Sequence, residues 1–371
     1  MPLREKPEQR SPLLSPELIA QGEQNDVQKE KIVRTEFPKQ KKNYNNTKKA
    51  VKKLFKAIPE LNNRQDRQRL ITDILFCRLA YGFMPDEYWC FHLENQTMEQ
   101  RKEWVSDIDR YIYVYSLNDL VEDRCFNNKG LTYKRFAKYY KRKALYITSE
   151  ADRQHFMRFA AEHPVFVKKA VMGSLGRGIE LVNLKEDNRS AEALFDEILK
   201  EGPHIVEERV IQGEKTAELN ASSVNTVRVI TLNTKKGISV LYTFMKVGRA
   251  GSFVDNGGSG GILVGIDRET GVMNTDGYDE LDKCYAEHPD NKTVFRGFQL
   301  PEWDKMLSIC KEMSASIPDV RMIGWDMAYS NKGWLVIEGN GMSQLIGPQI
   351  VWRRGVKKEF SEYLKDVDML V

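Results

Sequence analysis

The residues with the clearest chemical potential lie near the C-terminus, in the stretch Ile323–Met342. Asp326 ends an apolar run, a turn-forming Asn-Lys-Gly follows, and an apolar strand pattern then returns to Glu338. Such a hairpin brings Asp326 beside Glu338 and Asn340, and the spacing of two places the last two side chains on one face. Two carboxylates and an amide oxygen suit Mg²⁺ that already carries nucleotide phosphates. We favour a metal site over an ordinary surface hairpin, because the apolar flanks would half-bury these acids and a buried acid needs a partner.

A second candidate is a glycine-rich segment that follows a strand pattern ending in Lys168 and Lys169. Backbone N–H groups of such a loop can surround phosphate oxygens, and a strand lysine adds a positive charge. The segment matches neither a P-loop nor a dinucleotide fingerprint, and a glycine-rich hairpin turn explains it almost as well. The loop residues concerned are Gly173, Ser174, Gly176 and Gly178.

Two further segments place polar residues beside strand patterns. Arg228, three residues after Asn225, lies in a run of β-branched residues. A buried guanidinium needs an anion, and either a transferring phosphoryl oxygen or a structural salt bridge would serve. The later stretch G-G-S-G-G satisfies G-x-S-x-G, but a strand rather than a helix follows, which argues against a serine hydrolase. We interpret it as a loop that presents Asp255 and Asn256 to a ligand.

The elements around these motifs predict an α+β fold with four regions. Residues 1–30 are polar and read as a disordered tail or leader. Residues 31–125 show the three- and four-residue apolar spacing of helices, with 111–115 (YIYVY) as a strand-like exception. Residues 126–205 and 206–371 would form two lobes of short strands and a few helices, without the regular alternation of a doubly wound sheet.

Composition and charge limit the classes of function. The chain has 371 residues, of which 41% are hydrophobic and 30% charged, and no apolar stretch is long enough to span a bilayer. Five scattered cysteines and five scattered histidines form no zinc motif or disulfide framework, so we expect a cytoplasmic protein. The net charge of +4 conceals a segment from Lys31 to Lys56 that carries +9, so the remainder carries −5.

The basic segment leaves several interpretations open. A membrane headgroup layer, an acidic glycan or a nucleic acid would each attract it, and peripheral membrane association would follow from the first. A solvated helix face is the interpretation we favour for a charge run of this kind. Because no RNA-recognition, zinc-finger or helix-turn-helix motif accompanies it, we expect no nucleic-acid partner.

The order of these features resembles the ATP-grasp superfamily. A lysine-ended strand, a glycine loop, an acidic strand (VEERV), a buried arginine and a final Asp-x₁₁-Glu-x-Asn follow one another along the chain. The strings SSVNTVRVITL, VDN…GGI…IDRETGV and GWDMA…VIEGN are similar, more narrowly, to the sugar-transfer-associated branch found near polysaccharide biosynthesis genes. The resemblance covers roughly Asp86 to Arg354. It implies two α+β lobes that clasp ATP, with ATP and Mg²⁺ as cofactors.

The resemblance also implies roles for individual residues. Nucleotide binding would fall to Lys168, to the glycine loop, to the linker that contains Glu207, Glu208 and Val210, and to Lys129, whose FNNKGL is similar to the family's N-D-K. Since strand alternation lets only one of Lys168 and Lys169 face the nucleotide, the choice between them stays open. The remaining roles would be magnesium binding by Asp326, Glu338 and Asn340, catalysis by Arg228, Asn225 and Arg249, and substrate contact by Asp255 and Asn256.

The chemistry that the resemblance implies is amide formation. ATP would phosphorylate a carboxylate, and an amine would attack the acyl-phosphate to release phosphate. The carboxylate would belong to a sugar acid, an amino acid or a peptide linked to surface polysaccharide synthesis. Two alternatives remain: a kinase that stops at phosphoryl transfer, and a non-catalytic nucleotide-binding scaffold.

Overall fold

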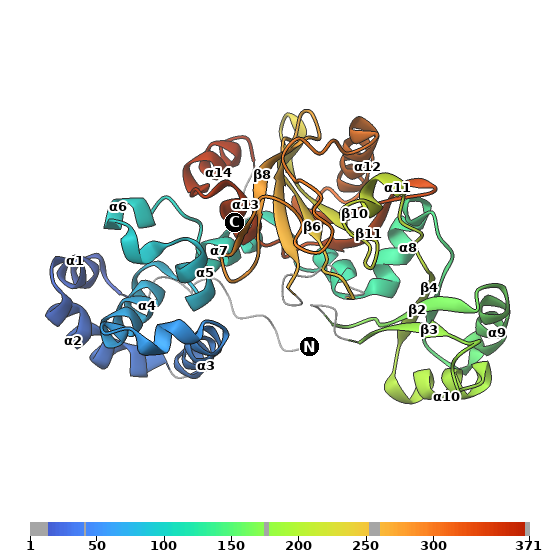
Figure 1. The fold of residues 1–371 in the computed structure, drawn as a ribbon, viewed down its shortest axis with the longest axis horizontal. Coiled ribbons are helices and arrows are strands. Elements are labelled where there is room, and N and C mark those ends of the chain that lie inside the picture. The colour runs from blue at the N-terminus through green and yellow to red at the C-terminus, as the bar shows by residue number, and fades with distance from the viewer. Residues whose placement is uncertain (1–13, 41, 174–177, 252–259, 368–371) are drawn as a thin grey trace.

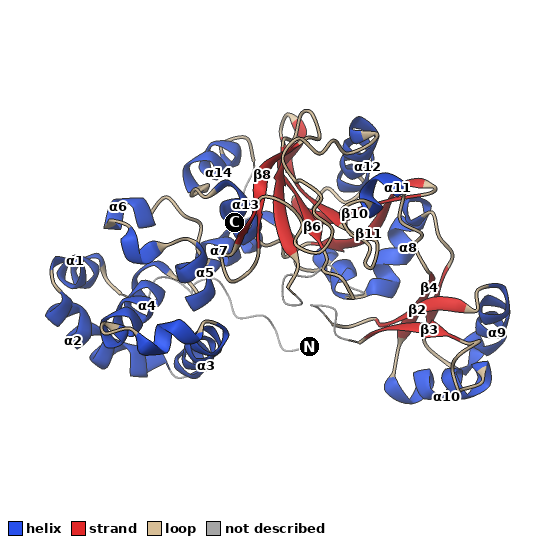
Figure 2. Cartoon of the chain, in the orientation of Figure 1, coloured by secondary structure: helices blue, strands red, loops and turns tan. Residues whose placement is uncertain are grey.

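The computed structural model describes residues 14–40, 42–173, 178–251 and 260–367 (Figure 1). Helices fill the first part of the chain, and strands begin at residue 144 (Figure 2). In the described part the strands form two antiparallel sheets, of four and seven strands. The predicted α+β class is therefore confirmed.

A helical region occupies residues 16–117 and lies at one end of the molecule, coloured blue to cyan in Figure 1. Side-chain caps begin several of its helices, as Ser15 does for the first and Asn25 for the second. Gly82 ends the fourth in the left-handed conformation that favours glycine. Its helices are α1 (Pro16–Gln24), α2 (Asp26–Glu36), α3 (Lys42–Ala57), α4 (Arg67–Tyr81), α5 (Pro85–Cys90), α6 (Met98–Arg101) and α7 (Asp107–Leu117).

Residues 14–30 differ from the predicted disordered tail, because they belong to a packed helical layer. Leu14, Ile32, Val33 and Phe37 form a buried cluster with residues of α4, including Phe76. Most of the polar residues in α1 and α2 are exposed, and only a few apolar residues enter the core. The apolar spacing that predicts a helix is therefore weak in this segment. Residues 1–13 lie outside the described part of the chain.

The strand-like run 111–115 is helical and belongs to α7. Ser106 caps this helix and exchanges hydrogen bonds with Asp109, in a capping-box arrangement that fixes its start. Val114 and Leu117 are fully buried, at the three-residue spacing of a helix. The alternating tyrosines favoured a strand, but the cap and this apolar spacing decide the local structure.

A four-stranded sheet with the order β1-β4-β2-β3 makes a small lobe, residues 144–208, coloured green in Figure 1. Phe156 and Phe195 from its two helices pack on one face of the sheet. The last strand extends past residue 205, where we predicted the boundary between lobes. The elements are β1 (Ala144–Ile147), α9 (Arg153–Glu162), β2 (Val165–Ala170), β3 (Ile179–Asn183), α10 (Ala191–Glu201) and β4 (His204–Glu208).

A seven-stranded sheet with the order β11-β10-β5-β6-β7-β8-β9 forms the larger lobe. Trp325 of β10 packs against Phe136 of α8 (Lys129–Tyr140) on one face, so this helix, predicted in the small lobe, covers the large sheet instead. The other elements are α11 (Glu214–Ala217), β5 (Thr226–Thr234), β6 (Gly237–Val247), β7 (Ile262–Ile266), β8 (Met273–Tyr278), β9 (Cys284–Tyr285), α12 (Trp303–Ala315), β10 (Met322–Ser330), β11 (Gly333–Asn340), α13 (Ile346–Trp352) and α14 (Lys357–Leu364).

The helical region is bonded directly to the hairpin of β10 and β11. Asn118, which caps the C-terminus of α7, donates to the carbonyls of Met322 (2.9 Å) and Gly341 (2.6 Å) and accepts from the Met322 N–H (2.8 Å). Asn118 is 1% exposed, so these hydrogen bonds do not compete with water. The contact fixes α7 at one end of the hairpin. Among the described residues, no helix combines the length and the apolar character needed to cross a membrane.

Candidate active site

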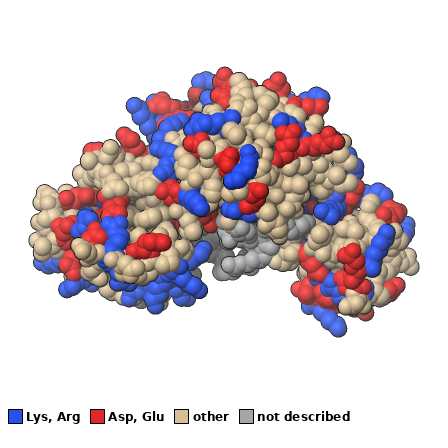
Figure 3. Space-filling model, in the orientation of Figure 1, with Lys and Arg blue, Asp and Glu red and all other residues tan. Residues whose placement is uncertain are grey.

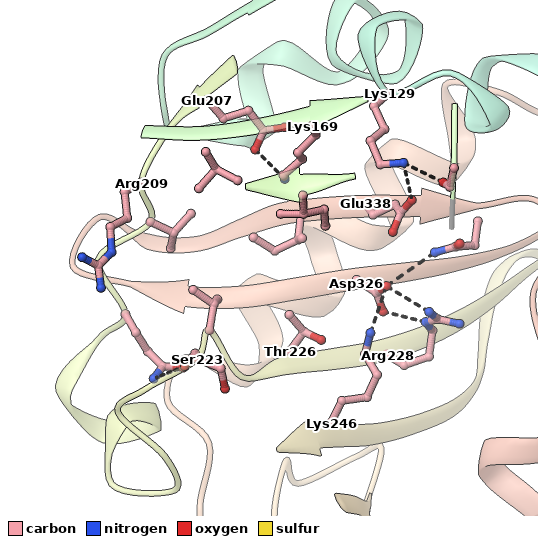
Figure 4. Close-up of a pocket in the computed structure, with 18 of the residues that line it drawn as sticks. Lys129, Lys169, Glu207, Arg209, Ser223, Thr226, Arg228, Lys246, Asp326 and Glu338 are labelled. Atoms are coloured by element: carbon pink, nitrogen blue, oxygen red, sulfur yellow. Dashed lines mark hydrogen bonds and ion pairs between the residues drawn. The ribbon is translucent and has the colours of Figure 1, made fainter. Parts of the chain in front are cut away.

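A cavity of about 1340 Å³ lies between the two sheets, and Figure 4 shows its central part. One wall comes from β2, β4 and the linker after β4, the other from β5, β6, β10 and β11. Residues of α7 and of the loop after β11 close one end. The cavity therefore gathers side chains from segments far apart in the sequence.

The predicted hairpin forms, and its register brings the three predicted ligands together. Asp326 pairs directly with Glu338 across the two strands, and Gly324 pairs with Asn340. All three predicted ligands line the cavity. The Asn340 amide nitrogen lies 3.5 Å from an Asp326 carboxylate oxygen. The spacing argument made from the sequence thus describes the geometry correctly.

Asp326 is held by two cations. Arg228 donates to both of its oxygens, at 2.7 and 2.9 Å, and Lys246 lies 3.1 Å away. Asp326 is 4% exposed, and burial opposes its ionisation. The charges of Arg228 and Lys246 outweigh burial and lower its pKa to about 2. Arg228 therefore makes the structural ion pair that the sequence suggested; it also lines the cavity, and its contact with a phosphoryl oxygen stays a prediction.

Glu338 lies in a different electrostatic setting. Burial, and then the charge of Asp326 across the strand pair, raise the pKa of Glu338. Lys129 is the nearest cation, with its ammonium 3.9 Å from a Glu338 oxygen. Facing carboxylates of this kind repel one another, and a divalent cation between them relieves the repulsion.

The residues present fit magnesium. In the described ranges no group of three or more His, Cys, Asp and Glu residues could hold a metal ion, so the set depends on the amide oxygen of Asn340. Mg²⁺ usually takes only one or two carboxylates and fills its other positions with water and phosphate oxygens. Asp326, Glu338 and Asn340 supply hard oxygen atoms in that proportion.

Of the two adjacent strand lysines, Lys169 faces the cavity and Lys168 does not. The Lys169 ammonium lies 2.8 Å from Glu207, inside the cavity. Lys168 points to the opposite face of β2, where Glu180, Glu197 and Glu201 surround its ammonium at 2.9 to 3.3 Å. The prediction that Lys168 contacts phosphates is wrong, because strand alternation directs it into a buried ion-pair cluster between β2 and α10, away from the cavity.

Glu207 belongs to a buried ion-pair network rather than to a simple linker. Arg142 donates to it at 2.8 and 3.0 Å and also donates to the Val336 carbonyl of β11 at 2.7 Å. Glu207 therefore connects the small lobe to the hairpin. Glu208 pairs with Lys332 at 3.0 Å, and both glutamates line the cavity with Arg209 and Val210. The predicted linker thus lies where a ligand can reach its backbone.

The start of the glycine loop also reaches the cavity. Gly173 lines it, and the Lys129 ammonium donates to the Gly173 carbonyl at 2.8 Å. Gly178, with φ of +71°, lies at the start of β3 and is not among the lining residues. Ser174 and Gly176 lie outside the described residues, as do Asp255 and Asn256.

The other two predicted catalytic residues have structural contacts. Asn225 is 1% exposed; its amide donates to the carbonyls of Thr216 and Asn220 and accepts from the Gly248 N–H. Arg249 pairs with Asp290 through two bonds of 3.0 Å. Neither residue lines the cavity. Both predictions rested on the resemblance, which located the segment but not the direction of its side chains.

Sequence reasoning missed Lys246 and Arg142 and left Lys169 undecided. Lys246 is a lone charge in an otherwise apolar strand, the same signal that drew attention to Arg228. Arg142 follows a helix in a basic stretch, and nothing in its neighbourhood distinguishes it from solvated residues.

The fold and the site define an ATP-grasp protein. Residues 109–367 match the family described as sugar-transfer associated ATP-grasp, so the chain belongs to this family. Membership confirms the predicted fold and the predicted use of ATP. A comparison with curated proteins found no match.

Several solved structures are similar to this chain at low identity. The ATP-grasp ligase PsnB, complexed with minimal precursor, Mg and ADP, has 14% identity and a TM-score of 0.40 over 68% of this chain and 62% of that one. D-alanine–D-alanine ligase from Helicobacter pylori has 16% identity and a TM-score of 0.40 over 66% and 62%. N5-carboxyaminoimidazole ribonucleotide synthetase from Thermotoga maritima has 11% and 0.39 over 66% and 50%. The alignments thus span less than two thirds of each of these proteins.

Proposed function

We propose that the protein is an ATP- and Mg²⁺-dependent carboxylate–amine ligase. The observation that carries the proposal is the carboxylate pair Asp326 and Glu338, faced by Lys129, Arg228 and Lys246 in one cavity. Such a set binds phosphates and metal and contains no activated protein nucleophile. The protein's contribution is then positioning and charge stabilisation.

Different residues along the cavity bind the base, the phosphates and the metal. The linker backbone at Glu208–Val210 binds the base, and Lys169 and Lys129 bind phosphate oxygens. Asp326, Glu338 and Asn340 hold magnesium, which neutralises phosphate charge when bound. Arg228 and Lys246 stand beside the reacting centre, where negative charge moves from the acceptor carboxylate to the leaving phosphate.

The test is trapping of the activated carboxylate. The protein is incubated with ATP, Mg²⁺ and a panel of carboxylates, with hydroxylamine as the amine, and hydroxamate and ADP are measured. We expect both products in equal amounts, and their loss in Glu338→Gln but not in Glu269→Gln, a control at an exposed turn. ADP with a stable phosphorylated product and no hydroxamate would establish a kinase instead. ATP binding without turnover on any acceptor would favour a scaffold.

The location of the protein is a second part of the proposal. Five lysines of α3 are exposed (Lys48, Lys49, Lys52, Lys53 and Lys56), and no acidic residue occurs between Phe37 and Ile58. Figure 3 shows this basic face on the lower edge of the helical region. We propose that it binds an anionic membrane surface rather than being only a solvated helix face, because five exposed lysines lie together with no acidic residue among them; each would add about 1 kcal/mol of attraction. That contact would hold a cytoplasmic enzyme beside membrane-linked polysaccharide synthesis.

Vesicle sedimentation tests this location. Binding to vesicles of phosphatidylglycerol and phosphatidylcholine should fall steeply with salt and disappear when Lys49, Lys52, Lys53 and Lys56 become Gln. A control variant changes the same number of exposed lysines elsewhere, at 236, 305, 311 and 358, and should retain binding. Equal loss of vesicle binding in both variants would show that the net charge of the protein, and not the basic face of α3, determines binding, which would overturn the proposed location.

A further inference from the structure

The cavity extends beyond the half that we assign to the nucleotide. At one end of the hairpin the linker meets β10, since Gln212 bridges to Ser330. At the other end Asn118 of α7 bonds to Met322 and Gly341. Asp326 lies four residues from each end of β10, which corresponds to about 13 Å in each direction. A nucleotide that runs from the linker to Asp326 therefore leaves the α7 half of the cavity for the second substrate.

Two tyrosines of α7 line that half. Tyr111 and Tyr115 are one helical turn apart, and their rings lie 6.3 Å apart at 30° to one another. Both are half-buried and belong to the cavity wall. The guanidinium of Arg110 lies 3.8 Å from the centre of the Tyr111 ring. Arg110 is itself 3% exposed and donates to Asp107 at 2.9 Å, so it holds this ring in place.

Asn127 and Gln344 add polar, uncharged side chains to that half beside the apolar Phe126 and Met342, and two cations lie at its inner end. Asn127 and Gln344 line the wall, and the Asn127 amide nitrogen also donates to the Asp123 carbonyl at 3.3 Å. An amide offers both donors and an acceptor. Arg228 and Lys246, 13% and 12% exposed, mark the inner end beside Asp326. From α7 toward Asp326, the cavity wall thus presents first aromatic rings and amide side chains and then the positive charges of Arg228 and Lys246.

We infer that this half, the acceptor subsite (Tyr111, Tyr115, Asn127 and Gln344), binds a sugar ring that carries a carboxylate. The inference rests on the proposed ligase function. The C–H face of a pyranose is apolar and packs on aromatic rings, while its hydroxyls exchange hydrogen bonds with the amides. Its carboxylate then points inward to Arg228 and Lys246. A small amino acid has no such apolar face to place against the two rings.

Calorimetry with hexuronic acids tests the inference, with ATP and Mg²⁺ present. Glucuronate and galacturonate serve as probes, with acetate as the carboxylate without a ring. At least one uronate should bind, acetate should bind at least about tenfold more weakly, and Tyr111→Ala or Tyr115→Ala should weaken the uronate about tenfold. Tyr111→Phe keeps the ring and should stay within about twofold. Circular dichroism melting confirms that each variant folds.

The outcomes separate this inference from the ligase proposal. Hydroxamate formed from another carboxylate, with neither uronate bound, would overturn the sugar assignment and leave the ligase intact. Equal binding of acetate and uronate, or unchanged affinity in both alanine variants, would also overturn it. Absence of ATP binding would refute the ligase proposal itself.

Discussion

Replacement of Glu207 by Gln tests whether a buried ion pair joins the small lobe to the hairpin. Glu207 is 3% exposed and accepts from Arg142 and Lys169. Glutamine keeps the shape of the side chain but removes its charge. Two cations would then face no anion at a position on the cavity wall where the side chains are only slightly exposed.

The cost follows from the pKa of Glu207. Burial opposes ionisation, but Arg142 and Lys169 outweigh it and lower the pKa from 4.5 to about 2. That difference corresponds to about 3 kcal/mol of folding free energy at neutral pH. Loss of one partner of a buried ion pair costs about 3–5 kcal/mol in other proteins, which agrees. Because the folded-state pKa is depressed, the stabilisation is complete above pH 4.5 and is lost as pH falls toward 2.

Urea unfolding followed by circular dichroism measures the difference between wild type and Glu207→Gln. We expect about 3 kcal/mol at pH 7, decreasing below pH 4.5. The control is Glu208→Gln on the same strand, where the side chain is 26% exposed and pairs with Lys332, so at most about 1 kcal/mol is expected. A loss for Glu207→Gln no larger than that of the control, or one independent of pH, would refute the reasoning.

Further predictions concern the other buried contacts. Lys168→Met should lower the thermal midpoint, because Glu180, Glu197 and Glu201 all lose the lysine ammonium, yet leave the Kd for ATP unchanged. Lys169→Met should raise that Kd about tenfold, and equal effects of the two variants in an ATP titration would contradict the assignment. Asn225→Ala should cost about 2–4 kcal/mol in urea unfolding, since three buried backbone groups lose their bonds, whereas Ser222→Ala should cost little. Gly339→Ala should cost about 1–3 kcal/mol, because its Cβ would lie 2.5 Å from an aromatic ring, and an unchanged unfolding midpoint would show that the ring moves aside.

The sequence allowed the hairpin to be predicted well and the directions of single side chains less well. Asp326, Glu338 and Asn340 follow from strand spacing and a turn, which are local properties. The choice between Lys168 and Lys169 depends on which face of β2 meets the cavity, and only the packing of the small lobe decides that. Residues 16–30 and 111–115 were misassigned because polarity and alternation gave a local signal that capping and distant contacts overrode.

Helix α7 has one face buried in the core and another face that lines the cavity. Val114 and Leu117 are fully buried and hold the helix in the core, whereas Tyr111 and Tyr115 are half-buried at the cavity. Substitutions on the cavity face therefore leave the apolar anchor intact, and changes away from buried contacts usually cost less than about 0.5 kcal/mol. Since Asn118 and the hairpin fix the helix relative to Asp326, an altered side chain on that face meets the same reacting centre. Under the proposed ligase function, substitutions on the cavity face of this one helix would therefore change the acceptor during evolution while Asp326, Glu338 and their cations stay the same.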